Sequence, residues 1–194
     1  MKRHQTWRVA VSAVLAIVAM LSVAQPAQAY VLLGYHIPSR VTFVPYSGFG
    51  SATISHFNEA IYQWNSRAGW DLMSREPVLR HYSTNYPYED GNNYIYKVNT
   101  GSEYVAECTS WYYEDSNELS ESDININAYY AWANSAQPGA FDVWSVFLHE
   151  TGHTAGLDDN PAFEAAVMYP YSSENTLKRF LHSDDRAGIN ALYR

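Results

Sequence analysis

Alternating patterns of apolar and polar residues predict helices and strands along most of the chain. Between residues 51 and 67 the apolar side chains recur every three or four positions, which is the period of a helix that buries one face; they are Ile54, Phe57, Ile61 and Trp64. Ser51 or Thr53 is the predicted N-cap of this helix, and Gly69 suits its C-terminal end. A second helix is predicted from Asp142, a suitable cap, to His153. A third should follow Ser183-Asp184-Asp185, because acidic residues stabilise a helix N-terminus.

Strand patterns occupy most of the remaining chain. Short runs rich in β-branched and aromatic residues predict strands at 40–44, 78–82, 94–98 and 104–113. The segment Asp123-Ile124-Asn125-Ile126-Asn127 alternates polar and apolar residues, which predicts a strand with one buried face. Strands dominate the first part and helices the last, so we expect an α+β fold.

The first 29 residues have the pattern of a secretory signal peptide. Lys2, Arg3 and Arg8 precede an apolar run from Val9 to Val23, and the small-residue motif Ala27-Gln28-Ala29 follows. The apolar run is shorter than an ordinary transmembrane helix. We therefore expect residues 1–29 to be removed and residues 30–194 to form one secreted, extracellular domain without a membrane anchor.

Composition narrows the possible partners of this domain. After removal of the signal the chain has nine basic and twenty acidic residues, a formal charge of −11 with histidine neutral. Such a charge argues against binding to nucleic-acid phosphates. We also expect the domain to be a monomer. Cys108 is the single cysteine, so internal disulfides are excluded and stability must come from packing or from a metal.

One motif carries recognisable chemistry. His149-Glu150-Thr151-Gly152-His153 places two histidines four residues apart within a predicted helix, so both imidazoles can bind one zinc ion. Glu150 lies beside the first ligand but is turned around the helix axis, where it can act as general base on a zinc-activated water. Two helical histidines and a glutamate on a solvated surface are the alternative for the pentapeptide alone.

The residues after the motif favour the catalytic interpretation. Gly156 can take a positive φ, which ends the helix and turns the chain back toward the metal. Asp159 then arrives where a third ligand is needed, and two histidines with one carboxylate leave a zinc position open for water. Asp158 competes for the third-ligand position, and His182 is a weaker candidate.

The extended motif, followed by Val167-Met168-Tyr169-Pro170, resembles the metzincin zinc peptidases and, among them, the bacterial matrixins that use aspartate as third ligand. The resemblance implies a twisted mixed sheet with an active-site helix and a C-terminal helix. It also implies a secreted endopeptidase in which Met168 packs beneath the metal and Tyr169, Pro170 and Tyr171 wall the specificity pocket on the leaving-group side. The substrate, a protein or peptide, should lie extended along a sheet edge.

The chain also departs from the matrixin pattern. The predicted domain starts close to its first strand, and Cys108 lacks the motif of the inhibitory propeptide cysteine. The histidine-rich loop that holds a structural zinc is missing, so we expect one zinc ion. The segment Glu89-Asp90-Gly91-Asn92-Asn93 is either a turn or part of a calcium site, and the turn is favoured. The rival function is a secreted zinc-binding protein without catalysis, which would have no need of Glu150.

Overall fold

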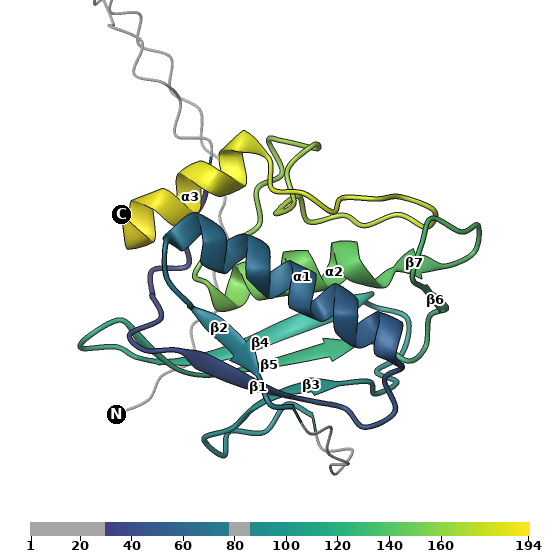
Figure 1. The fold of residues 1–194 in the computed structure, drawn as a ribbon, viewed down its shortest axis with the longest axis horizontal. Coiled ribbons are helices and arrows are strands. Elements are labelled where there is room, and N and C mark those ends of the chain that lie inside the picture. Colours follow the sequence, from purple (N-terminus) through teal and green to yellow (C-terminus); the bar gives the residue numbers. More distant parts are fainter. Residues whose placement is uncertain (1–29, 78–85) are drawn as a thin grey trace, which may run out of the picture.

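A computed structural model describes residues 30–77 and 86–194. Its elements are β1 (Val41–Pro45), α1 (Ser51–Ala68), β2 (Met73–Arg75), β3 (Asn93–Tyr96), β4 (Ala106–Tyr113), β5 (Glu118–Ile126), β6 (Trp132–Ala133), β7 (Phe141–Asp142), α2 (Val143–Thr154) and α3 (Ser183–Tyr193). The predicted signal peptide, and the predicted strand at 78–82, lie outside the described residues. The expected α+β fold, a mixed sheet with an active-site helix and a C-terminal helix, is confirmed (Figure 1).

The main sheet has five strands in the order β2-β1-β3-β5-β4. β1 pairs in parallel with both β2 and β3, and β3 pairs in parallel with β5. β4 runs antiparallel to β5 and forms the end of the sheet. The second sheet contains only the short strands β6 and β7. An edge strand keeps one row of backbone donors and acceptors unpaired, so β4 can accept a further strand.

Helices α1 and α2 lie together on one face of the main sheet, and α3 packs against α1 (Figure 1). The N-cap of α1 is Gly50, not Ser51 or Thr53 as predicted. Gly50 has extended backbone angles and makes no side-chain cap, while Ser51 and Thr53 are already helical. The predicted end is confirmed, because Gly69 has a φ of 86° and its N–H donates to the carbonyl of Asn65.

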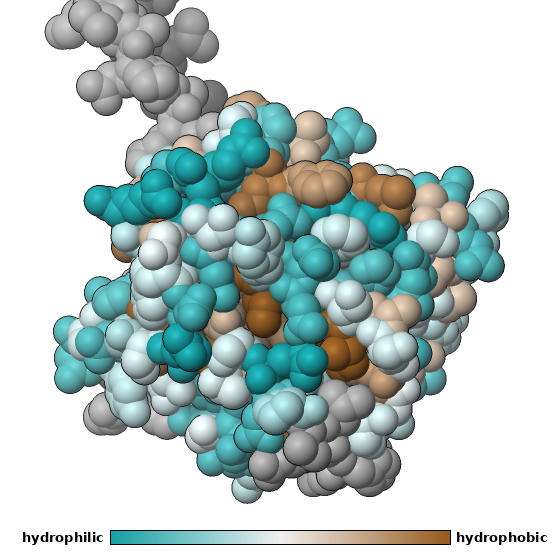
Figure 2. Space-filling view, viewed as in Figure 1, coloured by the Kyte–Doolittle hydropathy of each residue, from teal (hydrophilic) through white to brown (hydrophobic). Residues whose placement is uncertain are grey.

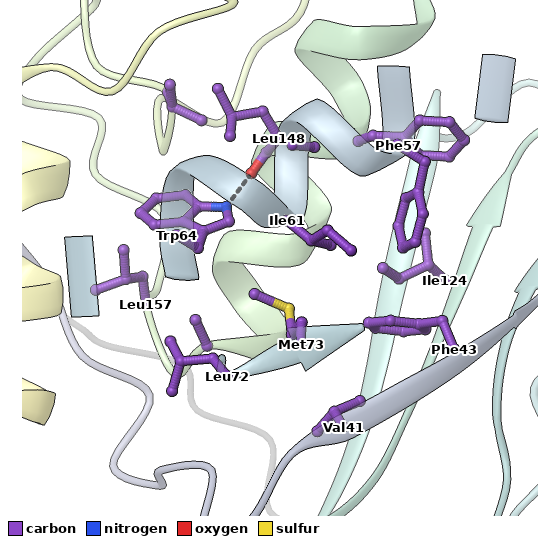
Figure 3. Packing of buried hydrophobic residues seen from close by; sticks show 14 of the residues in the cluster. Val41, Phe43, Phe57, Ile61, Trp64, Leu72, Met73, Ile124, Leu148 and Leu157 are labelled. Atoms are coloured by element: carbon purple, nitrogen blue, oxygen red, sulfur yellow. Dashed lines mark hydrogen bonds between the residues drawn. The ribbon is translucent and has the colours of Figure 1, made fainter. Parts of the chain in front are cut away.

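The hydrophobic core fills the space between these helices and the sheet. The apolar face predicted for α1 is confirmed: Phe57, Ile61 and Trp64 are buried against sheet residues such as Phe43 and Ile124 (Figure 3). The Trp64 indole Nε1 donates to the carbonyl of Leu148, 3.0 Å away, across the interface with α2. A buried indole N–H needs such an acceptor, so this bond also fixes the position of α2 relative to α1.

The strand predicted at 123–127 is longer and more deeply buried than its alternation suggests. All residues from Glu121 to Asn127 are buried, including the polar ones that were expected to face solvent. Their side chains bond the backbone of the segment that follows residue 86. Asp123 accepts from the N–H groups of Tyr88 and Tyr94, Asn125 bonds both backbone groups of Val98, and Asn127 accepts from Thr100. The polar face of β5 is therefore covered by chain and not by water.

The surface matches the acidic, polar composition. The face of the molecule seen in Figure 2 is hydrophilic over most of its area, with separate hydrophobic patches. In residues 30–77 and 86–194, no helix combines the length and apolarity needed to cross a membrane.

Candidate metal centre

Helix α2 carries the motif, and its N-terminus is held by an ion pair between a buried carboxylate and a partly buried arginine. The Asp142 side chain is the predicted N-cap and accepts from the backbone N–H of Ser145 at 2.9 Å. Arg179 donates to both carboxylate oxygens of Asp142, at 3.0 and 2.6 Å. Burial alone would raise the pKa of Asp142, but these bonds outweigh it and the pKa is lowered. The start of the helix is thereby tied to the segment before α3.

The far end of α2 is anchored by side chains that sequence reasoning did not single out. The hydroxyl of Tyr35 donates to the carbonyl of His153 at 2.7 Å. The hydroxyl of Tyr193 donates to the carbonyl of Ala155 at 2.9 Å. The hydroxyls of Ser122 and Thr154 lie 2.8 Å apart and join β5 to the helix. Aromatic or hydroxyl identity alone does not predict these roles, because each depends on a contact between segments far apart in the sequence.

The two histidines of the motif present their Nε2 atoms to each other. His149 Nδ1 lies 2.8 Å from the carbonyl oxygen of Val167, and His153 Nδ1 lies 2.9 Å from that of Leu157. A carbonyl oxygen can only accept, so each Nδ1 must carry the ring proton of a neutral imidazole. Each Nε2 is then an unprotonated acceptor, and the two lie 3.2 Å apart. Burial, followed by the influence of His153, lowers the pKa of His149 to about 3, which also favours the neutral ring.

Asp159 reaches the same point through the turn at Gly156. Gly156 has a φ of 94°, as predicted, and a Cβ at this position would lie 2.4 Å from the backbone oxygen of Tyr35. Asp159 Oδ1 is 3.5 Å from His149 Nε2 and 3.7 Å from His153 Nε2. Asp158 points elsewhere: its Oδ1 accepts from the backbone N–H of Asp159 at 2.8 Å. The structure therefore brings Asp159, and not Asp158, to the two histidines.

These three side chains fit a tetrahedral zinc ion. Ligands about 2.0–2.2 Å from zinc at tetrahedral angles lie roughly 3.4 Å apart, close to the separations described above. Asp159 Oδ1 is buried and has no hydrogen-bond partner, and two acceptor nitrogens face each other with no proton between them. A bound cation would satisfy all three lone pairs. Within the described residues, His149, His153 and Asp159 form the one group of three such side chains close enough to share an ion.

Glu150 lies in the same cleft as these residues. The cleft has a volume of about 750 Å³ and is lined by the two histidines, Glu150, Asp159 and residues of β4. Glu150 is only 5% exposed, and its burial, with the neighbouring charges of Asp159 and Glu107, raises its pKa to about 8. Burial also raises the pKa of Asp159. A buried carboxyl group with a perturbed pKa beside the candidate ligands is a candidate acid–base group.

Met168 is 2% exposed and packs directly beneath the metal-binding helix. A Cβ at Gly152 would lie 2.3 Å from its Sδ, so the glycine allows this close approach. The backbone around Met168 is held by Asp185, whose carboxylate accepts from the N–H groups of Val167 and Met168 at 3.0 and 3.1 Å. Asp185 was expected only to stabilise the start of α3. Its second role depends on a contact that the sequence does not reveal.

A second cavity of about 280 Å³ adjoins the cleft, and His149, Val146 and Tyr171 line both. Tyr169 lines this second cavity, whereas Pro170 lines the main cleft. The predicted pocket residues therefore lie at the walls of these two spaces.

Other sequence candidates have structural explanations. His182 is the N-cap of α3, where its ring accepts from the backbone N–H of Asp184 at 3.3 Å. Asp90 accepts from the backbone N–H of Asn92, and Gly91 has a φ of 86°, so residues 90–92 form a tight turn that leads into β3. Cys108 is a free thiol in the cleft, half-buried and within 3.3 Å of the Ser122 hydroxyl, and burial raises its pKa to about 11.

The chain was compared with protein families, curated sequences and solved structures. The family model described as matrixin matches residues 95–194, which include α2, the three candidate ligands and Met168. No curated protein sequence matches the chain. Among solved structures, high choriolytic enzyme 1, a hatching enzyme zinc-protease from Oryzias latipes (medaka fish), has a TM-score of 0.45 and 12% identity, covering 88% of this chain and 96% of its own. Metalloproteinase-II from Bacteroides fragilis has the same TM-score and identity, covering 84% of this chain and 55% of its own.

Proposed function

Because the chain belongs to the matrixin family of zinc metalloproteases, we propose that it is a secreted endopeptidase with the site described above as its catalytic centre. The observation that carries the proposal is the convergence of His149, His153 and Asp159 at the wall of a large cleft that also holds Glu150. A zinc-binding protein without catalysis would have no reason to bury a glutamate in that cleft.

We assign the ligand role to His149 Nε2, His153 Nε2 and Asp159 Oδ1. A zinc ion held there would supply Lewis-acid chemistry, lowering the pKa of a bound water and polarising the scissile carbonyl. The carbonyl oxygens of Val167 and Leu157 hold the two imidazole rings in the orientation and tautomer that this role requires.

Glu150 serves as the general base of the reaction. Its carboxylate takes a proton from the attacking water and then passes that proton to the leaving amine. Burial in the cleft keeps bulk water away from this carboxylate and strengthens its interaction with the reacting groups.

The substrate lies along the edge of β4. Cleft-lining residues run along this strand from Ala106 to Tyr112, a length of roughly 20 Å at about 3.4 Å per residue. An extended peptide can pair with the free edge of β4 while its scissile bond lies beside Glu150. A site of this length accommodates substrate residues on both sides of the cleaved bond, which favours an endopeptidase.

The activity is tested by incubating the purified protein with casein and a mixed peptide library. We expect cleavage at internal bonds, its loss on treatment with a zinc chelator, and its return when zinc is added back. The rival function, zinc binding without catalysis, predicts stoichiometric zinc but no cleavage. Release of single terminal residues only would instead contradict the endopeptidase assignment.

Secretion is tested separately, because residues 1–29 lie outside the described structure. We expect the exported protein to begin at Tyr30 when its N-terminus is sequenced. A start at Met1 in the exported form would contradict the signal-peptide interpretation, and a start beyond Arg40 would reveal a processed segment that we did not predict.

A further inference from the structure

The second cavity, beside His149, contains a lysine whose ammonium group forms no hydrogen bond or ion pair within the described residues. Lys178 lines this cavity, and its Nζ is buried without a hydrogen-bond partner. The nearest aromatic contact is the ring of Tyr169, whose centroid is 4.5 Å from Nζ. An ammonium group removed from water needs an opposite charge, because a cation–π contact replaces only part of its hydration.

The carboxylates near this lysine do not supply that charge directly. Asp142 also lines the cavity, but both of its oxygens accept from Arg179. Glu164 also lines the cavity but is exposed, and within the described residues neither it nor Asp185 forms an ion pair with Lys178. Desolvation lowers the pKa of Lys178, while the more distant charges of Glu164 and Asp185 oppose that shift. The ammonium group of Lys178 therefore lies in the cavity without a direct anionic partner.

The backbone at Lys178 is fixed to the metal-binding helix. Its N–H donates to the Ser145 hydroxyl at 2.8 Å, and that hydroxyl donates to Asp142 at 2.6 Å. The next residue, Arg179, pairs with the same carboxylate. The backbone of Lys178 is therefore held beside Ser145, which lies one helical turn before His149 in α2. The four flexible carbons of the lysine side chain let its ammonium group turn from the Tyr169 ring toward a ligand.

We propose that this cavity binds a substrate side chain that ends in a carboxylate, glutamate or aspartate, and that Lys178 is the specificity-determining residue. The proposal rests on the proteolytic function proposed above. Tyr169 and Tyr171 line the cavity, and the segment containing them was predicted to wall the pocket on the leaving-group side. Because that expectation puts the cavity on the leaving-group side, we place the acidic residue immediately after the cleaved bond.

The test compares two peptides that differ only at this position, one with Glu and one with Gln, which have nearly the same shape. For the wild-type protein, we expect kcat/KM to be at least about tenfold higher for the Glu peptide than for the Gln peptide, because the ammonium group of Lys178 discriminates against the neutral amide. Lys178→Met should bring the ratio close to one, mainly by lowering kcat/KM for the Glu peptide. Thermal unfolding of each variant shows whether it remains folded.

Two controls separate the pocket charge from other effects. Lys97→Met removes the same charge from an exposed position outside the cavity and should leave the ratio unchanged. Glu164→Gln removes the opposing carboxylate at the cavity and should increase the preference for Glu. If the wild type cleaved both peptides at equal rates, or if the preference survived Lys178→Met, this inference would be wrong but the proposed proteolytic function would stand. Absence of all chelator-sensitive cleavage would overturn the proposed function and this inference with it.

Discussion

Glu150→Gln is expected to abolish proteolysis while zinc stays bound. The substitution keeps the shape of the side chain and removes no proposed ligand, but an amide cannot accept the proton of the attacking water. General acid–base groups contribute about 10²–10⁴-fold to rate, and we expect a loss of kcat/KM in the upper part of this range because Glu150 acts on both the water and the leaving amine. The measurements are kcat/KM on one peptide and zinc content per protein molecule.

Glu107→Gln is the matched control for this variant. Glu107 lines the same cleft and is one of the charges that raise the pKa of Glu150, but it belongs to β4 and not to the motif. Its substitution should change kcat/KM by only a few fold. Near-normal activity of a folded, zinc-loaded Glu150→Gln protein would show that another group accepts the proton.

Asp159→Ala should weaken zinc binding by more than about 100-fold, since even loss of an outer-shell partner can cost 10–100-fold in affinity. The variant removes one of the three proposed ligands and leaves only the two histidines. Asp159→His should retain zinc, because imidazole is also a suitable ligand at this position. Zinc affinity is measured by competition with a chelator of known affinity, independently of any protease assay.

Asp158 provides the control, since it carries the same charge one residue earlier. Asp158→Asn keeps an oxygen acceptor for the Asp159 N–H and should leave zinc affinity unchanged. Asp158→Ala loses that hydrogen bond, worth about 1 kcal/mol, and should affect stability more than metal binding. If Asp158→Asn lost zinc while Asp159→Ala kept it, the ligand assignment would be wrong by one residue.

The sequence predicts the helices and the metal centre best, because both depend on local spacing. The apolar period of α1, the Asp142 cap of α2 and the acidic start of α3 are each encoded within a few neighbouring residues. The positive φ at Gly156 was equally predictable, since a chain that must turn sharply after a helix favours glycine. Helical spacing predicts that His149 and His153 lie on one face of the helix, and the turn at Gly156 predicts that Asp159 comes back to them.

Features that depend on contacts between distant segments could not be predicted in this way. The alternation at 123–127 indicated a solvated face, but Asp123 and Asn125 are buried because they bond the backbone of residues 88–98. Strand β2 has only three residues and no distinct pattern, so it was missed. The position of Lys178 could not be predicted either, because no motif surrounds it in the sequence. Its place at the cavity depends on the contact of its backbone with Ser145.

The contacts that support the metal centre set the order in which the protein can become active. Tyr35 and His153 are 118 positions apart, yet they are joined by one hydrogen bond, and the backbone of Met168 rests on Asp185 near the C-terminus. Such long-range contacts form late, because the entropy of closing a large loop must first be overcome. A nascent chain still lacking α3 has the complete motif but not the carboxylate beneath it. The contacts around the metal centre are therefore complete only once α3 has been made and packed.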